Sequence, residues 1–186
     1  LSSSSAASDV YKRQPHDLTP ETSWFDMAQA SINAIREVDT NTLIMVGGND
    51  WSSAERWIEQ SDTLKYLKDP ANNLAFEAHV YFDKDASGTY KYSYEEEECY
   101  LEKGIDRVKP FVEWIKQNKF HGFIGEYGIP DNDPRWNETL DLFLGYLQEN
   151  GINGTYWAAG PWWDSYFMAI TLSLIHISEP TRPRLI

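Results

Sequence analysis

The sequence predicts an α/β protein in which buried parallel strands are joined by crossover helices. Two observations carry this prediction. Segments with the apolar spacing of a helix alternate strictly with short apolar segments, and the order helix then strand occurs four times. The short segments are nearly continuous apolar runs, which is typical of strands covered on both faces.

The first half of the chain contains two of these pairs. Residues 21–38 repeat apolar side chains at three- and four-residue spacing, which is one stripe of an amphipathic helix. The apolar run at 42–48 ends in two glycines and predicts a short buried strand. Residues 52–60 begin with good capping residues and predict the second helix. Residues 73–81 predict the second strand.

The second half repeats the pattern after a long loop. Residues 83–98 are polar and aromatic and predict that loop. Helical spacing returns at 104–118 and again at 133–151. Each of these helices is followed by a predicted strand, the first at 121–128 and the second at 152–159.

The composition limits the classes of partner. The chain has a formal charge of −13, which repels nucleic-acid phosphates and anionic membrane surfaces, so we expect neither as a partner. No apolar run reaches the roughly 20 residues that a membrane-spanning helix needs. A single cysteine, Cys99, excludes an intrachain disulfide. Eight tryptophans supply aromatic surface for a core and for a binding site.

Polar and aromatic side chains gather where the predicted strands end. Parallel α/β folds place their chemistry at the carboxyl ends of the strands, so these side chains should share one rim. They are Asn49, Asp50 and Trp51, then Glu77, His79 and Tyr81, then Glu126 and Tyr127, and finally Trp157. Aromatic faces stack on sugar rings, and a few polar groups fix sugar hydroxyls. Neither a glycine-rich phosphate loop nor a zinc-ligand pattern is present, so we expect no cofactor and no metal.

Five segments in order resemble one known family. The segments PHD, GNDWSSA, HVYFDKDASGT, GEYG and YWAAG are similar to glycoside hydrolase family 5, the cellulase family, and in particular to its endo-β-1,4-glucanases. The resemblance covers nearly all of residues 15–170. It implies a (β/α)8 TIM barrel, for which about 250 residues are needed. This chain would then supply an incomplete barrel, roughly the C-terminal half, with strands 5 to 8 and the intervening helices.

The same resemblance implies roles for individual residues. A retaining glycosidase uses two carboxyl groups about 5 to 5.5 Å apart, and the GEYG motif places the nucleophile at Glu126. His79 and Tyr81 match an H-x-Y pair in which the phenol donates a hydrogen bond to the nucleophile and the imidazole contacts substrate or the acid/base group. Three further residues are expected to bind or orient substrate: Trp157, His16 and Trp51.

For other residues at this rim, a structural role is an alternative to a functional one. Packing of its own loop is an equal alternative for Trp51. For the acidic residues Asp50, Glu77 and Asp83 we expect loop capping and hydrogen-bond networks rather than direct catalysis.

The family's acid/base phrase, Asn-Glu-Pro-His-Asp, is only partly present. Pro15, His16 and Asp17 fit it, but Arg13 and Gln14 stand where the family has Asn and the acid/base Glu. An amide does not exchange a proton near neutral pH as a carboxylic acid does. The acid/base Glu is therefore expected to be absent, with Gln14 at its position.

The two ends of the chain can be encoded by related DNA, which no requirement of a protein fold explains. Residues 9–14 and 172–177 can be encoded by one short DNA element read from opposite strands, and that element resembles a sequencing-library adapter. We therefore expect residues 1–14 and 171–186 to be non-native tails around a partial catalytic domain at 15–170.

The resulting hypothesis is a parent protein that hydrolyses β-1,4-linked glucans such as cellulose with retention, while this chain is inactive. The parent is expected to be a secreted monomer that binds a polysaccharide or oligosaccharide. A β-mannanase or mixed-linkage glucanase of the same fold is the alternative within the class. A non-catalytic carbohydrate-binding protein is the alternative from another class, although binding alone does not require Glu126 beside His79 and Tyr81.

Overall fold

The protein, seen in a computed structural model, is described for residues 15–19, 23–160, 163 and 165–170. Its strands form one four-stranded sheet in the order β1-β2-β3-β4, and every neighbouring pair is parallel. They are β1 (Ile44–Gly47), β2 (Leu74–His79), β3 (His121–Tyr127) and β4 (Asn153–Tyr156). Sequential strands are neighbours, as helical crossovers between parallel strands require, so the predicted parallel α/β sheet is confirmed.

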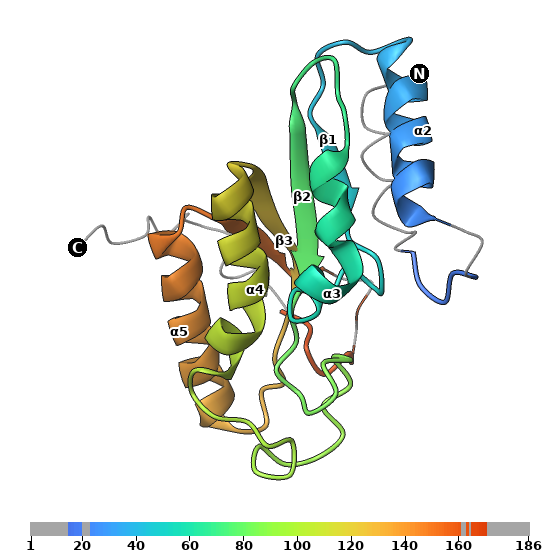
Figure 1. Cartoon of the computed structure of the whole chain (residues 1–186). Helices are drawn as coiled ribbons and strands as arrows, with labels where there is room; N and C mark the ends of the chain where they lie inside the picture. Colours follow the sequence, from blue (N-terminus) through green and yellow to red (C-terminus); the bar gives the residue numbers. More distant parts are fainter. Residues whose placement is uncertain (1–14, 20–22, 161–162, 164, 171–186) are drawn as a thin grey trace.

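The helices alternate with these strands (Figure 1). They are α2 (Trp24–Arg36), α3 (Trp57–Ser61) continued by the 3-10 helix η1 (Asp62–Tyr66), α4 (Lys103–Asn118) and α5 (Pro134–Glu149). Two of them begin at side-chain caps that the sequence supplies. Ser23 Oγ accepts the backbone N–H of Asp26, and Asp133 accepts that of Arg135, which satisfies donors that the first helical turn leaves without partners.

The helix predicted at 52–60 begins later than expected, at Trp57. Asp50, Trp51 and Ser52 have φ angles of 55°, 52° and 59°, so three consecutive residues lie in the left-handed region. Residues with side chains rarely adopt that region, and a run of them is incompatible with a right-handed helix. Residues 52–54 then pair with the end of β2, because the His79 N–H donates to the Ser52 carbonyl and the Ala54 N–H donates to the His79 carbonyl. The apolar periodicity encodes neither the turn nor this pairing, so the predicted start was too early.

Aromatic side chains fill the space between the sheet and its helices. Phe76 of β2 meets Trp114 of α4 edge to face, with ring centroids 5.0 Å apart, and Trp57 of α3 contacts Phe111 and Trp114 in the same way. Phe76, Trp57 and Phe111 are completely buried. Edge-to-face packing adds to the burial of large apolar areas, so this cluster fixes the sheet against its helices.

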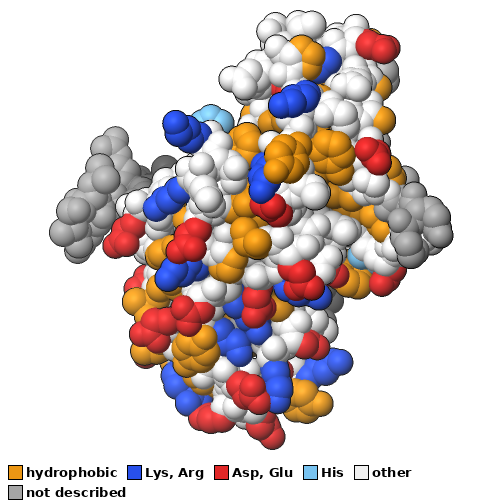
Figure 2. Space-filling model, in the orientation of Figure 1, with side chains coloured by type: hydrophobic (Ala, Val, Ile, Leu, Met, Phe, Trp, Pro, Cys, Tyr) orange, Lys and Arg blue, Asp and Glu red, His pale blue; other side chains and the backbone are white. Residues whose placement is uncertain are grey.

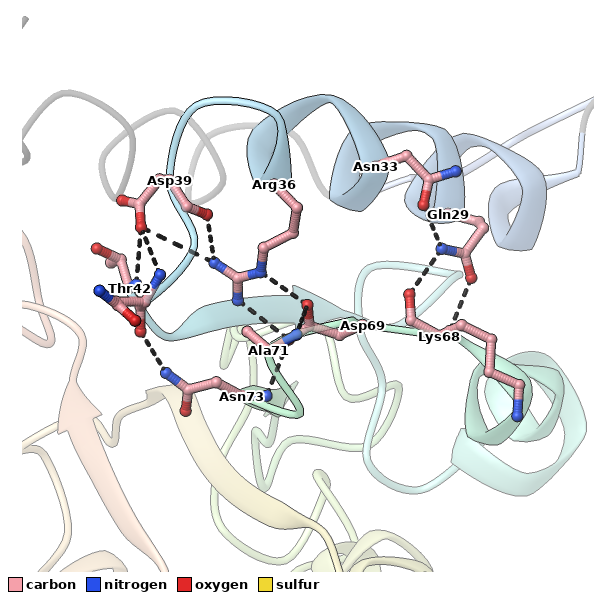
Figure 3. A network of polar contacts seen from close by, with 10 residues as sticks. Gln29, Asn33, Arg36, Asp39, Thr42, Lys68, Asp69, Ala71 and Asn73 are labelled. Carbon is pink, nitrogen blue, oxygen red and sulfur yellow. Dashed lines mark hydrogen bonds and ion pairs between the residues drawn. The ribbon is translucent and has the colours of Figure 1, made fainter.

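A polar network attaches α2 to the chain before β2 (Figure 3). The Arg36 guanidinium donates two hydrogen bonds to Asp69, from Nε at 2.7 Å and from Nη2 at 3.0 Å. Asp69 also accepts the backbone N–H groups of Ala71 and Asn73. Hydrogen bonding from Arg36 is the main reason why the pKa of Asp69 is lowered to about 2.

The surface in the orientation of Figure 2 carries acidic and basic side chains next to one another. Ion pairs among the described residues include Lys84 with Glu98 and Arg135 with Glu95. Among the described residues, no helix is long and apolar enough to cross a membrane.

Candidate active site

Glu126 and His79 lie side by side at the carboxyl ends of neighbouring strands. The register of β2 and β3 pairs His79 with Glu126, after a shift between Ala78 and His79. This pairing brings together two residues that are 47 positions apart in the sequence. The shared rim predicted from the parallel sheet is therefore present for these two residues.

Tyr81 approaches the same carboxylate. Its hydroxyl donates a hydrogen bond to Glu126 Oε2 at a distance of 2.9 Å. Burial, followed by the negative charge of Glu126, raises the pKa of Tyr81 far above its ordinary value. The phenol therefore keeps its hydrogen across the physiological pH range and remains a donor to the carboxylate.

His79 lies between two carboxylates. Its Nδ1 is 3.6 Å from Glu126 Oε2, and its Nε2 is 2.8 Å from Glu77 Oε1. The side chains of His79 and Glu77 are almost fully buried, whereas 17% of the Glu126 side chain is exposed. The Nε2 contact joins the imidazole to a carboxyl group on the same strand, and the Nδ1 contact joins it to one on the neighbouring strand.

The loop after β2 holds Tyr81 in place. Asp83 is completely buried and accepts the backbone N–H groups of Gly88, Thr89 and Tyr90. Gly88 has a φ of 73°, and a Cβ there would lie 2.9 Å from the Tyr81 ring. Asp83 therefore has the expected role of a loop cap, and the loop that it organises packs directly on the phenol.

A buried arginine from α4 supports the same loop. Arg107 donates hydrogen bonds to the backbone carbonyls of Tyr81, Asp83 and Lys84. Its Nε also lies 3.3 Å from a carboxylate oxygen of Glu55. Sequence reasoning missed Arg107, because its position on a helix far from the motifs gives no signal of these contacts.

Trp51 and His16 form a stacked pair at the edge of the site. Their ring centroids are 4.4 Å apart with an interplanar angle of 10°, and 47% of Trp51 is exposed. The backbone N–H of Trp51 donates to the carbonyl of Pro15. The left-handed turn that contains Trp51 thus presents a flat aromatic surface next to the PHD segment. Asp50 of this turn is paired with Arg56.

Trp157 follows the end of β4, the strand that neighbours β3. Its backbone N–H donates to the carbonyl of Tyr127 at 2.8 Å, and its ring meets that of Trp163 edge to face. Trp157 is partly buried against the hydrophobic core. The described residues that line the cleft beside Glu126 do not include it.

A cleft of about 330 Å³ opens at this rim. The residues that line it include Glu126, His79 and Tyr81 together with Asp50 and Trp51. Its volume is in the range of small-molecule sites, which are about 300–1,000 Å³. Within the described part of the chain, no group of three His, Cys, Asp or Glu residues could hold a metal ion. Gln14, which is predicted to stand at the acid/base position, lies outside the described residues.

A parallel sheet with a carboxylate, an imidazole and a phenol together at its carboxyl end is consistent with a glycoside hydrolase, in which a carboxylate at such a rim attacks the sugar. A comparison with protein families matches residues 13–162 to Cellulase, glycosyl hydrolase family 5. The chain belongs to this family.

Individual relatives agree with the family match. Endo-beta-1,4-glucanase B of Aspergillus niger is 36% identical over 149 residues, which are 78% of this chain and 43% of that protein. The chain thus spans about half the length of the curated relatives that it matches.

Solved structures agree as well. Pseudomonas stutzeri endoglucanase Cel5A in complex with cellobiose superposes with a TM-score of 0.79 at 40% identity, over 87% of this chain and 48% of that one. XacCel5A in complex with cellopentaose gives a TM-score of 0.75 at 34% identity, over 87% and 53% of the two chains. The four-stranded sheet described above accordingly corresponds to about half of the barrel of its relatives.

Proposed function

We propose that the full-length protein containing residues 15–170 is an endo-acting hydrolase of β-1,4-linked glucans that retains the anomeric configuration. The observation that carries the proposal is the 2.9 Å hydrogen bond from the Tyr81 hydroxyl to Glu126, beside His79 at the end of the neighbouring strand. A donor aimed at a carboxylate favours its ionised form and fixes its direction, as a nucleophile requires. The solved relatives that were crystallised with cellobiose and cellopentaose support a β-glucan as the substrate.

The chemistry assigned to this chain's residues has two steps. In the first, a Glu126 oxygen bonds to the anomeric carbon while the glycosidic bond breaks and its oxygen receives a proton from the acid/base residue. In the second, water attacks the same carbon, the bond to Glu126 breaks, and the acid/base residue accepts the water's proton. The cleft wall at Trp51 would hold a sugar beside the reacting bond, whereas Trp157 is not among the described residues that line this cleft.

We further propose that the present chain does not turn over cellulose. Gln14 occupies the position of the acid/base residue and offers no acidic proton to the leaving group. In the corresponding gene, the codon at this position is expected to encode Glu. Sequencing the genomic DNA upstream of the Pro15 codon tests this directly, because a Gln codon there would contradict it.

The experiment that tests the function uses the full-length protein on a panel of polysaccharides. We expect release of reducing ends from soluble cellulose, less from mannan and mixed-linkage glucan, and loss of this activity in Glu126→Gln. A preference for mannan or mixed-linkage glucan would replace the substrate assignment with that alternative. Binding of glucan without hydrolysis by the wild type would support a carbohydrate-binding protein instead.

A further inference from the structure

Glu77 is a buried acid with a specific partner in the site. It lies two residues before His79 on β2, so both side chains project from the same face of the strand. Only 5% of Glu77 is exposed, and its Oε1 is 2.8 Å from His79 Nε2. The other ring nitrogen of His79 faces Glu126 at 3.6 Å. The contacts of Glu77 and Glu126 thus lie on opposite sides of one imidazole.

Two glycines on the neighbouring strands make room for the Glu77 carboxylate. A Cβ built on Gly125 of β3 would lie 1.6 Å from Glu77 Oε1, and the three nearest atoms that it would meet all belong to Glu77. A Cβ on Gly47 of β1 would lie 3.4 Å from Glu77 Oε2. Gly125 has no left-handed φ, so the space taken by Glu77, and not the backbone conformation, disfavours a side chain there.

We propose that Glu77 is a positioning residue for the hydrolytic reaction. Its carboxylate accepts the Nε2 hydrogen of His79 and thereby holds Nδ1 toward Glu126, and Gly125, directly before the nucleophile, is the residue that gives this carboxylate its space. The proposal rests on the proposed function for its effect on catalysis. The orientation of the imidazole can be measured independently of activity.

The activity test uses the full-length protein with its acid/base residue. Outer partners of metal-binding histidines typically contribute about 10- to 100-fold, and we expect a factor of the same order here, so Glu77→Ala should lower kcat by that factor with little change in KM. Glu77→Gln should restore most of kcat, because its amide oxygen can accept the same hydrogen. Glu113→Gln, on the exposed face of α4, is the control and should match the wild type. Equal kcat values for Glu77→Ala and Glu113→Gln would overturn the proposal.

A double-mutant cycle tests the role of Gly125. Gly125→Ala alone should displace the carboxylate and lower kcat about as much as Glu77→Ala. Adding Gly125→Ala to Glu77→Ala should cause little further loss, because the clash no longer exists. Losses that multiply would show that the two residues act separately and would overturn the assigned role of Gly125. If Gly125→Ala does not fold, recovery of folding in the double variant supports the proposal, and continued unfolding contradicts it.

Nitrogen NMR of 15N-histidine-labelled protein provides the readout that a merely structural role would not change. In the wild type and in Glu77→Gln, we expect the His79 signals of a single form with hydrogen on Nε2. In Glu77→Ala, a mixture of tautomers is expected. An unchanged His79 spectrum in Glu77→Ala overturns the positioning role even when Glu126→Gln is inactive. Full activity in Glu126→Gln together with the expected NMR change would instead reject only the proposed function.

Discussion

Two buried charged networks lie at opposite ends of the same strands, and they are built differently. Near the amino ends, Arg36 and Asp69 form one ion pair, and Asp69 also accepts two backbone N–H groups. At the carboxyl ends, His79 contacts Glu77 through one ring nitrogen and Glu126 through the other. Glu126 also lines a cleft of about 330 Å³. Glu126 and His79 line this cleft themselves, whereas Arg36 and Asp69 line neither it nor the pocket of about 530 Å³ at the amino ends of the strands.

The difference shows what distinguishes a supporting acid from a candidate catalytic one. One cation balances Asp69, whose hydrogen bonds join α2 to the chain before β2, so this carboxylate is used entirely within the fold. At the other end, two carboxylates share one imidazole, and a phenol donates to one of them. This second arrangement places two carboxyl groups, an imidazole and a phenol at one rim, and Glu126, His79 and Tyr81 of this group line a cleft.

The largest expected effect concerns position 14, for which the family resemblance predicts the acid/base residue. Full-length proteins that carry Glu or Gln at this position should differ by about 10²- to 10⁴-fold in cellulose hydrolysis, which is the usual contribution of general acid–base catalysis. Release of dinitrophenol from a dinitrophenyl β-cellobioside should fall much less in its first turnover, because that leaving group needs no proton. Equal losses on both substrates would argue against an acid/base role at this position.

Tyr81→Phe should have the next largest effect. It removes the hydrogen bond to Glu126, and hydrogen bonds to charged groups contribute about 1.5–3 kcal/mol, so kcat should fall about 10- to 100-fold. Tyr66→Phe is a matched control, because Tyr66 is 60% exposed on η1. Steady-state kinetics with soluble cellulose would measure both variants. An unchanged kcat in Tyr81→Phe would show that the Tyr81 hydroxyl does not contribute to catalysis.

At the amino ends, Asp69→Asn should lower stability without lowering the kcat of the folded enzyme. The pKa of Asp69 is about 2 in the folded protein and about 3.9 in an unfolded chain, so its stabilisation is complete above about pH 4 and is lost as the pH falls toward 2. Thermal unfolding measured between these pH values should therefore depend less on pH in Asp69→Asn than in the wild type. A fall in kcat with unchanged stability would show that Asp69 serves the reaction and not the fold, which would contradict the distinction drawn between the two networks.

The smallest expected effect belongs to Trp51. If its exposed ring stacks on a sugar, Trp51→Ala should raise KM about 2- to 10-fold, which corresponds to the roughly 0.5–1.5 kcal/mol of an aromatic contact. Trp51→Phe should keep most of this affinity. An unchanged KM with a lower melting temperature in Trp51→Ala would instead identify packing of the loop as its role.

The sheet and the main site pair were accessible from the sequence for physical reasons. The alternation of apolar segments determines a parallel sheet, and parallel strands bring their carboxyl ends to one rim, where His79 and Glu126 meet. Strand alternation also placed Glu77 on the same face as His79. The expectation of a hydrogen-bond network for Glu77 agrees with its contact to the imidazole.

Other features depend on contacts that a pattern does not encode. The late start of α3 follows from the left-handed turn at 50–52 and from the pairing of residues 52–54 with His79, although Ser52 and Ser53 are good capping residues in isolation. The space that Gly125 leaves for Glu77 and the contacts of Arg107 with the loop after β2 join elements that are far apart in the sequence. Only the folded arrangement reveals them.

Covalent trapping tests the central claim most directly. The full-length protein would be incubated with a 2-deoxy-2-fluoro-cellobioside that carries a good leaving group, since the fluorine slows hydrolysis of a glycosyl-enzyme intermediate, and the labelled peptide would be identified by mass spectrometry. We predict a stoichiometric label on Glu126. A label on Glu77 or on another residue, or inactivation without any covalent label, would contradict the assignment of Glu126 as the nucleophile.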